Sequence, residues 1–140
     1  ISTAYWALIQ LTDIDKDLKD INGANWQSIN KLPRLIFDHK QMVEQALSEL
    51  QMQGKIKPIG FELLPEKFTL VQLQDLYEAI YQRRVDKRNF RKKLLSMNIL
   101  EKLDEKEKVT SKKGAYYYKF IKERYKKLIQ NGFYFNLDVN

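Results

Sequence analysis

Two helical patterns separated by a short turn constrain the fold of this chain more than any other feature. After Thr69, which is a suitable N-cap, apolar residues recur at the three- and four-residue spacing of an amphipathic helix. These residues are Leu70, Leu73, Leu76, Tyr77 and Ile80. Gln82–Val85 forms a short turn, and Asp86 caps a second helix that we predict to end at Met97. The pattern predicts a helix-turn-helix.

The residues after Met97 predict a hairpin of two strands. Asn98 suits the left-handed position that ends a helix. We expect strands at Ile99–Leu103 and Ala115–Phe120, joined by the charged and flexible tip Asp104–Gly114. Helix, turn, helix and hairpin, in this order, are typical of a winged helix-turn-helix, in which the hairpin tip is the wing.

The first part of the chain predicts strands and one long helix. Pro65–Lys67 is the predicted boundary between this part, residues 1–64, and the winged helix domain, residues 65–140, and the fold class is α+β. A final amphipathic helix is expected at Ile121–Gln130, and Gly132 ends it. The elements expected before the boundary are a buried strand at Ile1–Leu11, a loop at Thr12–Asn25, a short strand at Asn25–Ile29, a helix from Asp38 to Gln53 that Gly54 stops, and an extended segment at Lys57–Leu64.

Positive charge is concentrated in the second half of the chain. Residues 1–66 carry 7 Lys and Arg against 9 Asp and Glu, whereas residues 67–140 carry 18 against 9. The net charge of +7 therefore arises after residue 66. Such asymmetry is expected of a nucleic-acid-binding module, and a basic surface kept for solubility is the alternative.

The second helix of the pattern, Asp86–Met97, has an apolar side and a basic side. The residues that fall together on the apolar side of a helical wheel are Phe90, Leu94 and Met97. The opposite side carries Arg88, Lys92 and Ser96, flanked by Asn89 and Arg91. No Asp or Glu lies between Lys87 and Leu100 to neutralise the basic side, and DNA phosphates would supply the missing negative charge.

The side-chain types on this helix match those that read and hold DNA. Arg binds guanine O6 and N7 with two hydrogen bonds, and Asn does the same for adenine N6 and N7. Contacts to phosphates position a helix without reading sequence. The predicted DNA-binding residues are Arg83, Arg84, Lys87, Arg88, Asn89, Arg91, Lys92, Ser96, Lys112 and Lys113, and Lys106 and Lys108 also lie near the wing tip. The alternative is a protein-binding winged helix whose basic helix is merely solvated.

The sequence offers little material for catalysis or for a metal site. It has no cysteine and one histidine, so thiolate sites, transition-metal sites and catalytic triads are not expected. His39 lies at the start of a predicted helix, where a packing role is favoured. Asp13, Asp15 and Asp17 alternate as in a calcium loop, but Leu18 stands where such a loop needs Gly.

Membrane insertion and export are not predicted either. No apolar run approaches the roughly 18 residues needed to span a bilayer, and no signal segment is present. We therefore expect a cytoplasmic protein with no membrane partner. Because the chain begins at Ile1, inside an expected strand and without Met, we also expect it to be a fragment of a longer protein.

Two segments of the second half resemble a known family. The run LPEKFTL from Leu64 with the helix that follows it, and the run DKRNFRKK from Asp86, resemble the linker, first helix and recognition helix of Nudix-related transcriptional regulators of the NrtR type. The resemblance covers about half of the chain. Trp26, Leu32-Pro33 and Phe37-Asp38-His39 resemble the late portion of the Nudix-like α/β domain that precedes the winged helix in that family.

This resemblance implies a regulator with two functions. The Nudix-like domain would sense a small-molecule effector, and a homodimer would bind double-stranded operator DNA through its winged helices. The implied effector is an ADP-ribose-like nucleotide or a sugar such as arabinose, and the sequence leaves both open, as it does repression and activation. His39 is the one candidate for the effector pocket.

The chain lacks the catalytic motif that gives Nudix hydrolases their name. That motif needs a Gly, five residues, a Glu, and then an Arg-Glu and a Glu-Glu pair that bind magnesium. Gly60 and Glu66 satisfy the opening spacing, but Gln74 and Asp75 follow where Arg-Glu is needed. We therefore predict no enzyme and no cofactor in this chain, and Mg²⁺ only for a longer protein that keeps the motif upstream. In that case the alternative function is a Nudix hydrolase of ADP-ribose or sugar nucleotides.

Overall fold

The computed structural model describes part of the chain in two compact units. The described residues are 3, 5–9, 25–109, 113–133, 135 and 137. The two units are Ile1–Ser48 and Glu49–Asn140. The second unit therefore begins before the boundary expected at Pro65–Lys67, because it includes the end of a long helix and the turn that follows. The assignment of residues 1–64 to a Nudix-like domain stays a prediction.

The first unit contains less regular structure than the sequence predicts. It has a 3₁₀ helix, η1 (Ile29–Lys31), and the first part of helix α2 (His39–Ile56). The expected strands at Ile1–Leu11 and Asn25–Ile29 are wrong for the described residues among them, which are 3, 5–9 and 25–29, the last of them in η1. A strand is stable only when it pairs with another, and none pairs with these residues in the described part of the chain. The expected loop at Thr12–Asn25 lies almost entirely outside the described residues.

Gly54 lies inside α2 and does not stop it, contrary to the prediction. The helix begins after Asp38 as expected, but it continues past Gly54, which is buried. A Cβ atom at Gly54 would lie 3.2 Å from Ile80 Cγ2. The missing side chain therefore allows a close approach between two helices. The Tyr81 hydroxyl joins the same contact, 3.3 Å from the carbonyl oxygen of Gly54 and 3.0 Å from that of Leu137.

The segment Lys57–Leu64 is compact, and the extended conformation predicted for it is wrong. A turn leads into a second 3₁₀ helix, η2 (Phe61–Leu63), and Gly60 makes the turn with a left-handed φ of 81°. This path buries the Phe61 ring against Phe120, with 4.4 Å between the ring centroids. Burial of the aromatic ring favours the compact turn over an extended segment.

Strand β1 (Phe68–Thr69) leads directly into helix α3 (Leu70–Tyr81). Thr69 caps the helix as predicted, and the cap is reciprocal. The Thr69 hydroxyl accepts a hydrogen bond of 3.3 Å from the backbone amide of Gln72. In return, the side-chain oxygen of Gln72 accepts one of 2.8 Å from the backbone amide of Thr69. The buried residues of the helix are Leu70, Leu73, Tyr77, Ile80 and Tyr81. Leu76 is half-buried.

Helix α4 (Lys87–Ser96) follows the predicted turn. Asp86 is its N-cap, and the Asp86 carboxylate accepts a hydrogen bond of 2.7 Å from a backbone amide of the first turn. Asn98 ends the helix in the left-handed conformation with a φ of 53°, as predicted. The apolar side packs inward through Phe90 and Leu94, which are fully buried, and Met97, which is half-buried.

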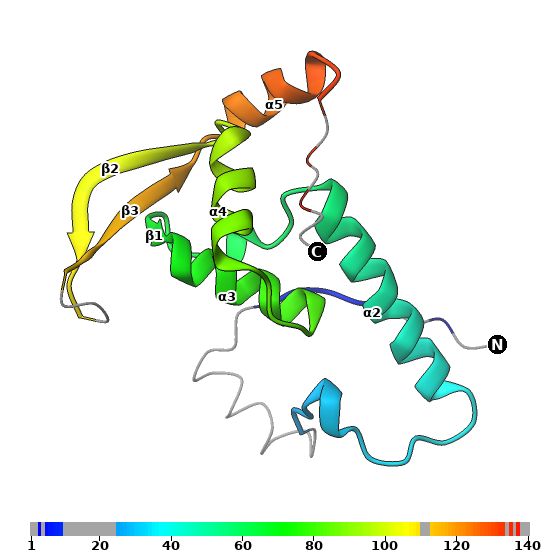
Figure 1. The fold of residues 1–140 in the computed structure, drawn as a ribbon. Coiled ribbons are helices and arrows are strands. Elements are labelled where there is room, and N and C mark those ends of the chain that lie inside the picture. Colours follow the sequence, from blue (N-terminus) through cyan, green and yellow to red (C-terminus); the bar gives the residue numbers. More distant parts are fainter. Residues whose placement is uncertain are drawn as a thin grey trace. The chain divides into compact units, whose positions relative to one another are not determined.

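The hairpin is longer than the sequence predicts. Strands β2 (Leu100–Glu107) and β3 (Ala115–Phe120) are antiparallel, and β3 lies between β1 and β2. The prediction for β3 is confirmed, whereas β2 extends beyond the expected Ile99–Leu103 and shortens the tip. Its extra residues pair with β3 after an irregularity between Lys102 and Lys106. Figure 1 shows the hairpin projecting from one side of α3 and α4.

Helix α5 (Lys122–Gln130) closes the winged helix. Arg124 Nη1 donates a hydrogen bond of 3.2 Å to the Leu100 carbonyl oxygen, and the Tyr125 and Phe120 rings lie 6.1 Å apart. Gly132 ends the helix region with a φ of 78°, as predicted. The α+β class and the winged helix-turn-helix are therefore confirmed. Within the described residues, no helix combines the length and apolar character needed to cross a bilayer.

Candidate nucleic-acid interface

Helix α4 presents its basic side to solvent, as the helical wheel predicts. The exposed side chains on this side are Arg88, Asn89, Lys92 and Ser96. The Ser96 hydroxyl donates a hydrogen bond of 2.7 Å to the Lys93 carbonyl oxygen, so it is held against the helix backbone. Arg88 and Lys92 are one helical turn apart and project from the same side. The exposed side is wide enough to offer two cations and an amide to a nucleic acid groove.

The charges on α4 oppose the ordinary electrostatics of a helix. Lys87 and Arg88 stand in the first turn, where the helix dipole favours anions, and the helix holds no Asp or Glu. Like charges one turn apart, such as Arg88 and Lys92, also repel. A helix that lacks compensating acids gains stability when it meets an external anion. This arrangement therefore favours a polyanionic partner.

The turn before α4 is fixed by Glu78, which sequence reasoning did not single out. Its carboxylate accepts hydrogen bonds of 3.1 Å from the Gln74 side-chain amide, 3.1 Å from the Val85 amide and 2.8 Å from Arg84 Nη1. These donors hold the pKa of Glu78 below its usual range, with Gln74 contributing most. Arg84, a predicted DNA-binding residue, forms this ion pair although its side chain is 92% exposed, and Arg83 beside it is also exposed. The ion pair joins a residue of α3 to a residue of the turn, which periodicity does not detect.

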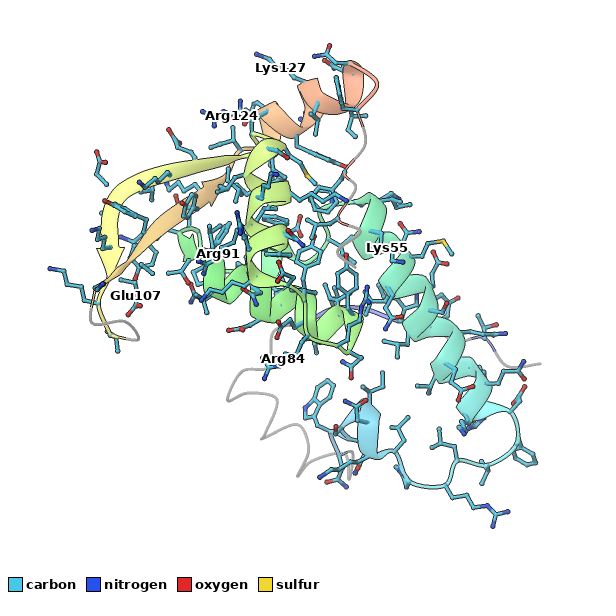
Figure 2. All side chains as sticks on the ribbon, viewed as in Figure 1. Lys55, Arg84, Arg91, Glu107, Arg124 and Lys127 are labelled. Carbon is cyan, nitrogen blue, oxygen red and sulfur yellow. The ribbon has the colours of Figure 1, made fainter. Side chains whose placement is uncertain are left out.

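Arg91 lies on the side of α4 that faces the hairpin (Figure 2). It is half-buried, whereas its predicted neighbours on the basic side are exposed. Its Nε atom is buried and has no hydrogen-bond partner among the described residues. Arg91 lines a hollow together with Lys87, Tyr116 and Tyr118. The structure thus separates Arg91 from the outward row formed by Arg88 and Lys92.

The hairpin adds further cations beside this hollow. Lys106 Nζ lies 4.4 Å from the centroid of the Tyr116 ring, and Lys102 Nζ lies 3.6 Å from the same centroid. Lys108 and Lys113 are exposed near the tip, and Lys112 lies outside the described residues. Lys102 was not predicted, because the β-strand residue two positions after a buried leucine normally faces the core.

The opposite face of the hairpin carries charges that are paired. Lys67 Nζ contacts the Glu105 carboxylate, and Lys119 Nζ lies 2.5 Å from Glu66 Oε1. These contacts raise the pKa of Lys67 and lower that of Glu66. Lys67 Nζ also lies 5.3 Å from the centroid of the Tyr117 ring. The residues just before β1 are thereby tied to both strands of the wing.

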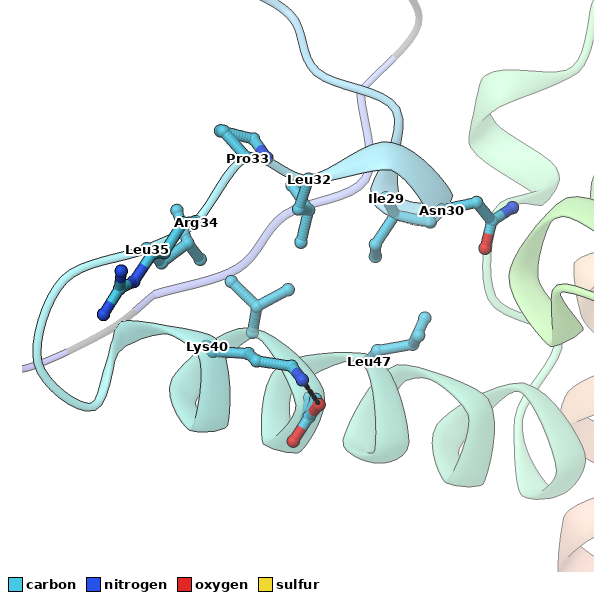
Figure 3. A pocket seen from close by; sticks show the side chains of 10 residues that line it. Ile29, Asn30, Leu32, Pro33, Arg34, Leu35, Lys40 and Leu47 are labelled. Atoms are coloured by element: carbon cyan, nitrogen blue, oxygen red, sulfur yellow. Dashed lines mark ion pairs between the residues drawn. The ribbon is translucent and has the colours of Figure 1, made fainter.

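A separate hollow of about 480 Å³ lies in the first unit, between η1 and α2. Figure 3 shows its apolar lining, which includes Ile29, Leu32 and Leu47. An ion pair of 3.7 Å between Lys40 and Glu44 lies at its edge. His39, the candidate effector contact, does not line this hollow and instead lies against Phe37, with 6.3 Å between the ring centroids. The described residues contain no cluster of His, Asp and Glu that could hold a metal ion.

Comparison with known proteins agrees with this geometry. Residues 60–120 match the family model of the NrtR DNA-binding winged helix domain. Over 127 residues the chain is 26% identical to the ADPR responsive transcriptional repressor NtrR of Acinetobacter baylyi, a match that covers 89% of this chain and 50% of the repressor. The chain thus spans about half the length of the curated relative that it matches.

Two solved structures of NrtR from Shewanella oneidensis share the fold. The structure complexed with a 27mer DNA has a TM-score of 0.55 and 24% identity, and covers 75% of this chain and 46% of that one. A second structure of the same protein has a TM-score of 0.53 and 23% identity, and covers 76% and 45%. Residues 60–120 of this chain are thus similar to the NrtR DNA-binding winged helix domain in sequence, and the chain shares the fold of the two NrtR structures.

Proposed function

We propose that this chain is the DNA-reading part of a transcriptional regulator that binds an operator in duplex DNA through helix α4. The observation that carries the proposal is the exposed basic side of α4, which has no acidic residue, on a helix whose apolar side is buried against α3. Arg88 and Asn89 are the residues assigned to base edges, and Lys92 is assigned to phosphates. The winged helix family and the similar structure bound to DNA support this assignment.

The regulator responds to a small molecule bound outside the winged helix. The relative from Acinetobacter is named for its response to ADPR, which favours an ADP-ribose-like effector over a sugar. The protein acts in the cytoplasm as a homodimer on a palindromic operator, since a symmetric dimer presents two recognition helices to two half-sites. Neither DNA binding nor effector control requires a cofactor in this chain, and no catalytic step is assigned to it.

Selection from random duplex DNA with the full-length protein, with and without ADP-ribose, tests the proposal. We expect a palindromic sequence to be enriched, and the affinity for it to change when ADP-ribose is added. Affinity should fall steeply as salt rises, because several phosphates are neutralised. If no sequence is enriched and binding is independent of salt, the protein-binding alternative is correct.

Arg88→Ala tests the assignment of the recognition helix. Loss of a bidentate contact should lower affinity for the selected sequence by about 1–3 kcal/mol and remove the preference at one base pair in each half-site. Lys127→Ala removes an exposed cation of α5, far along the chain from α4, and serves as the matched control (Figure 2). An Arg88→Ala protein that keeps its full base preference would show that α4 is not the reading helix.

A further inference from the structure

A hollow of about 530 Å³ lies between α4 and the base of the wing, apart from the outward side of α4. Its walls include the start of α3, the side of α4 that faces the hairpin, and strand β3. The residues that matter are Val71, Lys87, Arg91, Tyr116 and Tyr118. Among the described residues, both charged residues in its lining are cations, and no acidic residue lines it.

Arg91 is held in this hollow with part of its hydrogen-bonding capacity unused. Its Nε atom is shielded from solvent and has no acceptor among the described residues. A guanidinium carries five N–H donors and no acceptor, so it requires oxygen atoms around it. A buried donor that lacks a partner is unfavourable, and such groups in folded proteins are usually satisfied by a ligand or water. The position of Arg91 therefore indicates an acceptor that enters the hollow from outside.

Other cations lie in or beside the hollow: Lys87 lines it, and Lys102 and Lys106 contact the ring of Tyr116, which also lines it. Lys87 lies one helical turn before Arg91, so the two like charges share one side of α4. Across the hairpin, Lys102 pairs with Tyr118 and Lys106 pairs with Tyr116, and cross-strand partners project from the same sheet face. That face begins in the core at Leu100 and Phe120, which also pair, and becomes basic toward the wing tip. Within the described part of the chain, none of these four cations forms an ion pair.

The other face of the same hairpin shows that this is not a general property of the wing. There, Lys67 and Lys119 are each paired with a glutamate. The chain thus neutralises the cations on one face with its own carboxylates and leaves those on the other face for a partner. An anion with several oxygen atoms, such as a phosphate group, fits a hollow lined by one guanidinium and one ammonium group, with two further ammonium groups on the hairpin beside it.

We propose that this hollow binds one phosphate group of the operator backbone, and that Arg91 and Lys87 anchor it. The proposal rests on the function proposed above. Because Arg88 on the outward side and Lys87 and Arg91 on the hairpin side belong to one helix, a phosphate fixed at the hollow sets the depth and register of α4 in the groove. Arg91 is then a positioning residue for the whole duplex and does not read a base. It also joins the wing to the recognition helix when DNA is bound.

The test compares three variants of the full-length protein on the selected operator and on a random duplex. Arg91→Gln should lower affinity for both duplexes by the same factor, roughly tenfold for one charge-assisted contact. The slope of log affinity against log salt should become shallower by about one. Lys87→Gln, at an exposed position that packing does not require, should act in the same way. Arg88→Ala should instead reduce the ratio between the two affinities.

A neutral phosphate analogue identifies the source of the phosphate group. Single methylphosphonates are placed in turn along the operator. One position should weaken wild-type binding and have no further effect on Arg91→Gln, because both changes remove the same contact. If no position behaves in this way, and inorganic phosphate alone raises the Tm of wild type but not of Arg91→Gln, the hollow binds a free anion and the proposal is wrong.

Two further outcomes are decisive. If Arg91→Gln lowers the operator affinity while leaving the random-duplex affinity unchanged, Arg91 reads a base and the phosphate site is excluded. If the wild-type protein binds neither duplex, the function proposed above fails as well, which separates that failure from failure of the hollow alone.

Discussion

Helices α3 and α4 form the two halves of one helix-turn-helix, yet their surfaces differ sharply. Helix α3 buries five of its side chains, and its cap is a reciprocal pair of hydrogen bonds between Thr69 and Gln72. Helix α4 buries two, begins with two cations, and is capped by the Asp86 carboxylate alone. The acid on α3 that lies nearest the turn, Glu78, is satisfied by three donors of the chain itself.

The difference teaches which part of the pair specifies the fold and which part is available for a partner. On α3, the side chains of Gln72, Gln74 and Glu78 find hydrogen-bond partners inside the chain, so substitutions of these residues should change stability. Polar groups of α4 other than its cap face outward or toward the wing, so substitutions there should change binding. The predictions below test this separation, beginning with the largest expected effect.

Leu73→Ala should be the most destabilising of these changes. Leu73 is fully buried on α3, and truncation of a buried leucine to alanine typically lowers the free energy of unfolding by about 2–5 kcal/mol. DNA affinity per folded molecule should not change. Leu95→Ala removes the same atoms from α4, where the residue is 45% exposed, and is the matched control with a clearly smaller effect. Denaturant unfolding and operator titration measure the two quantities, and equal destabilisation by both variants would contradict the comparison.

The two helix caps provide a smaller and more selective test. Thr69→Ala removes half of the capping box on α3 and should lower stability by about 1 kcal/mol with no change in DNA affinity. Asp86→Asn keeps a good cap on α4 but removes its negative charge, so stability should fall only slightly, by roughly 0.3–1 kcal/mol from the lost dipole interaction. Because Asp86 lies beside the surface assigned to phosphates, the DNA affinity of the Asp86→Asn protein should rise several-fold at low salt. A fall in affinity for Asp86→Asn would place α4 away from the DNA.

The contrast between the helices also explains how much the sequence could predict. Caps, helical periodicity and the left-handed Asn98 are local signals, so α3, the turn and α4 were predicted closely. Gly54 carries the same local signal as a helix stop, but its role depends on Ile80, which approaches from 26 residues away in the chain. Strand β2 was predicted too short, because its charged residues are held by backbone pairing with β3 and carry no apolar alternation.

The candidate site shows the same division between local and distant information. The exposed row with Arg88 and Lys92 follows from the helical wheel alone. The helical wheel also groups Arg91 with that row. In the fold, the wing lies beside Arg91, so this side chain is half-buried and lines the hollow. The Glu78–Arg84 pair crosses a turn whose shape has no periodic signature. Sequence reasoning therefore identified the basic helix that we propose to face DNA, and the fold was needed to distinguish its two basic sides.

The smallest expected effect is on the decline of stability at acid pH (the acid limb), to which the turn between α3 and α4 contributes through Glu78. The pKa of Glu78 is lowered in the folded state, so the folded state binds its proton less readily than the unfolded chain, whose Glu has a pKa near 4.5. The carboxylate therefore contributes stability above pH 4.5, and this contribution is lost as the pH falls through the lower pKa of the folded state. Glu78→Gln should lower stability near neutral pH and flatten its decline below pH 4.5.

Glu123→Gln on α5 removes the same charge and controls for net charge. The free energy of unfolding of each variant is measured by urea unfolding at several pH values between about 3 and 7. An unchanged acid limb in Glu78→Gln would show that the turn is held without the Glu78 carboxylate.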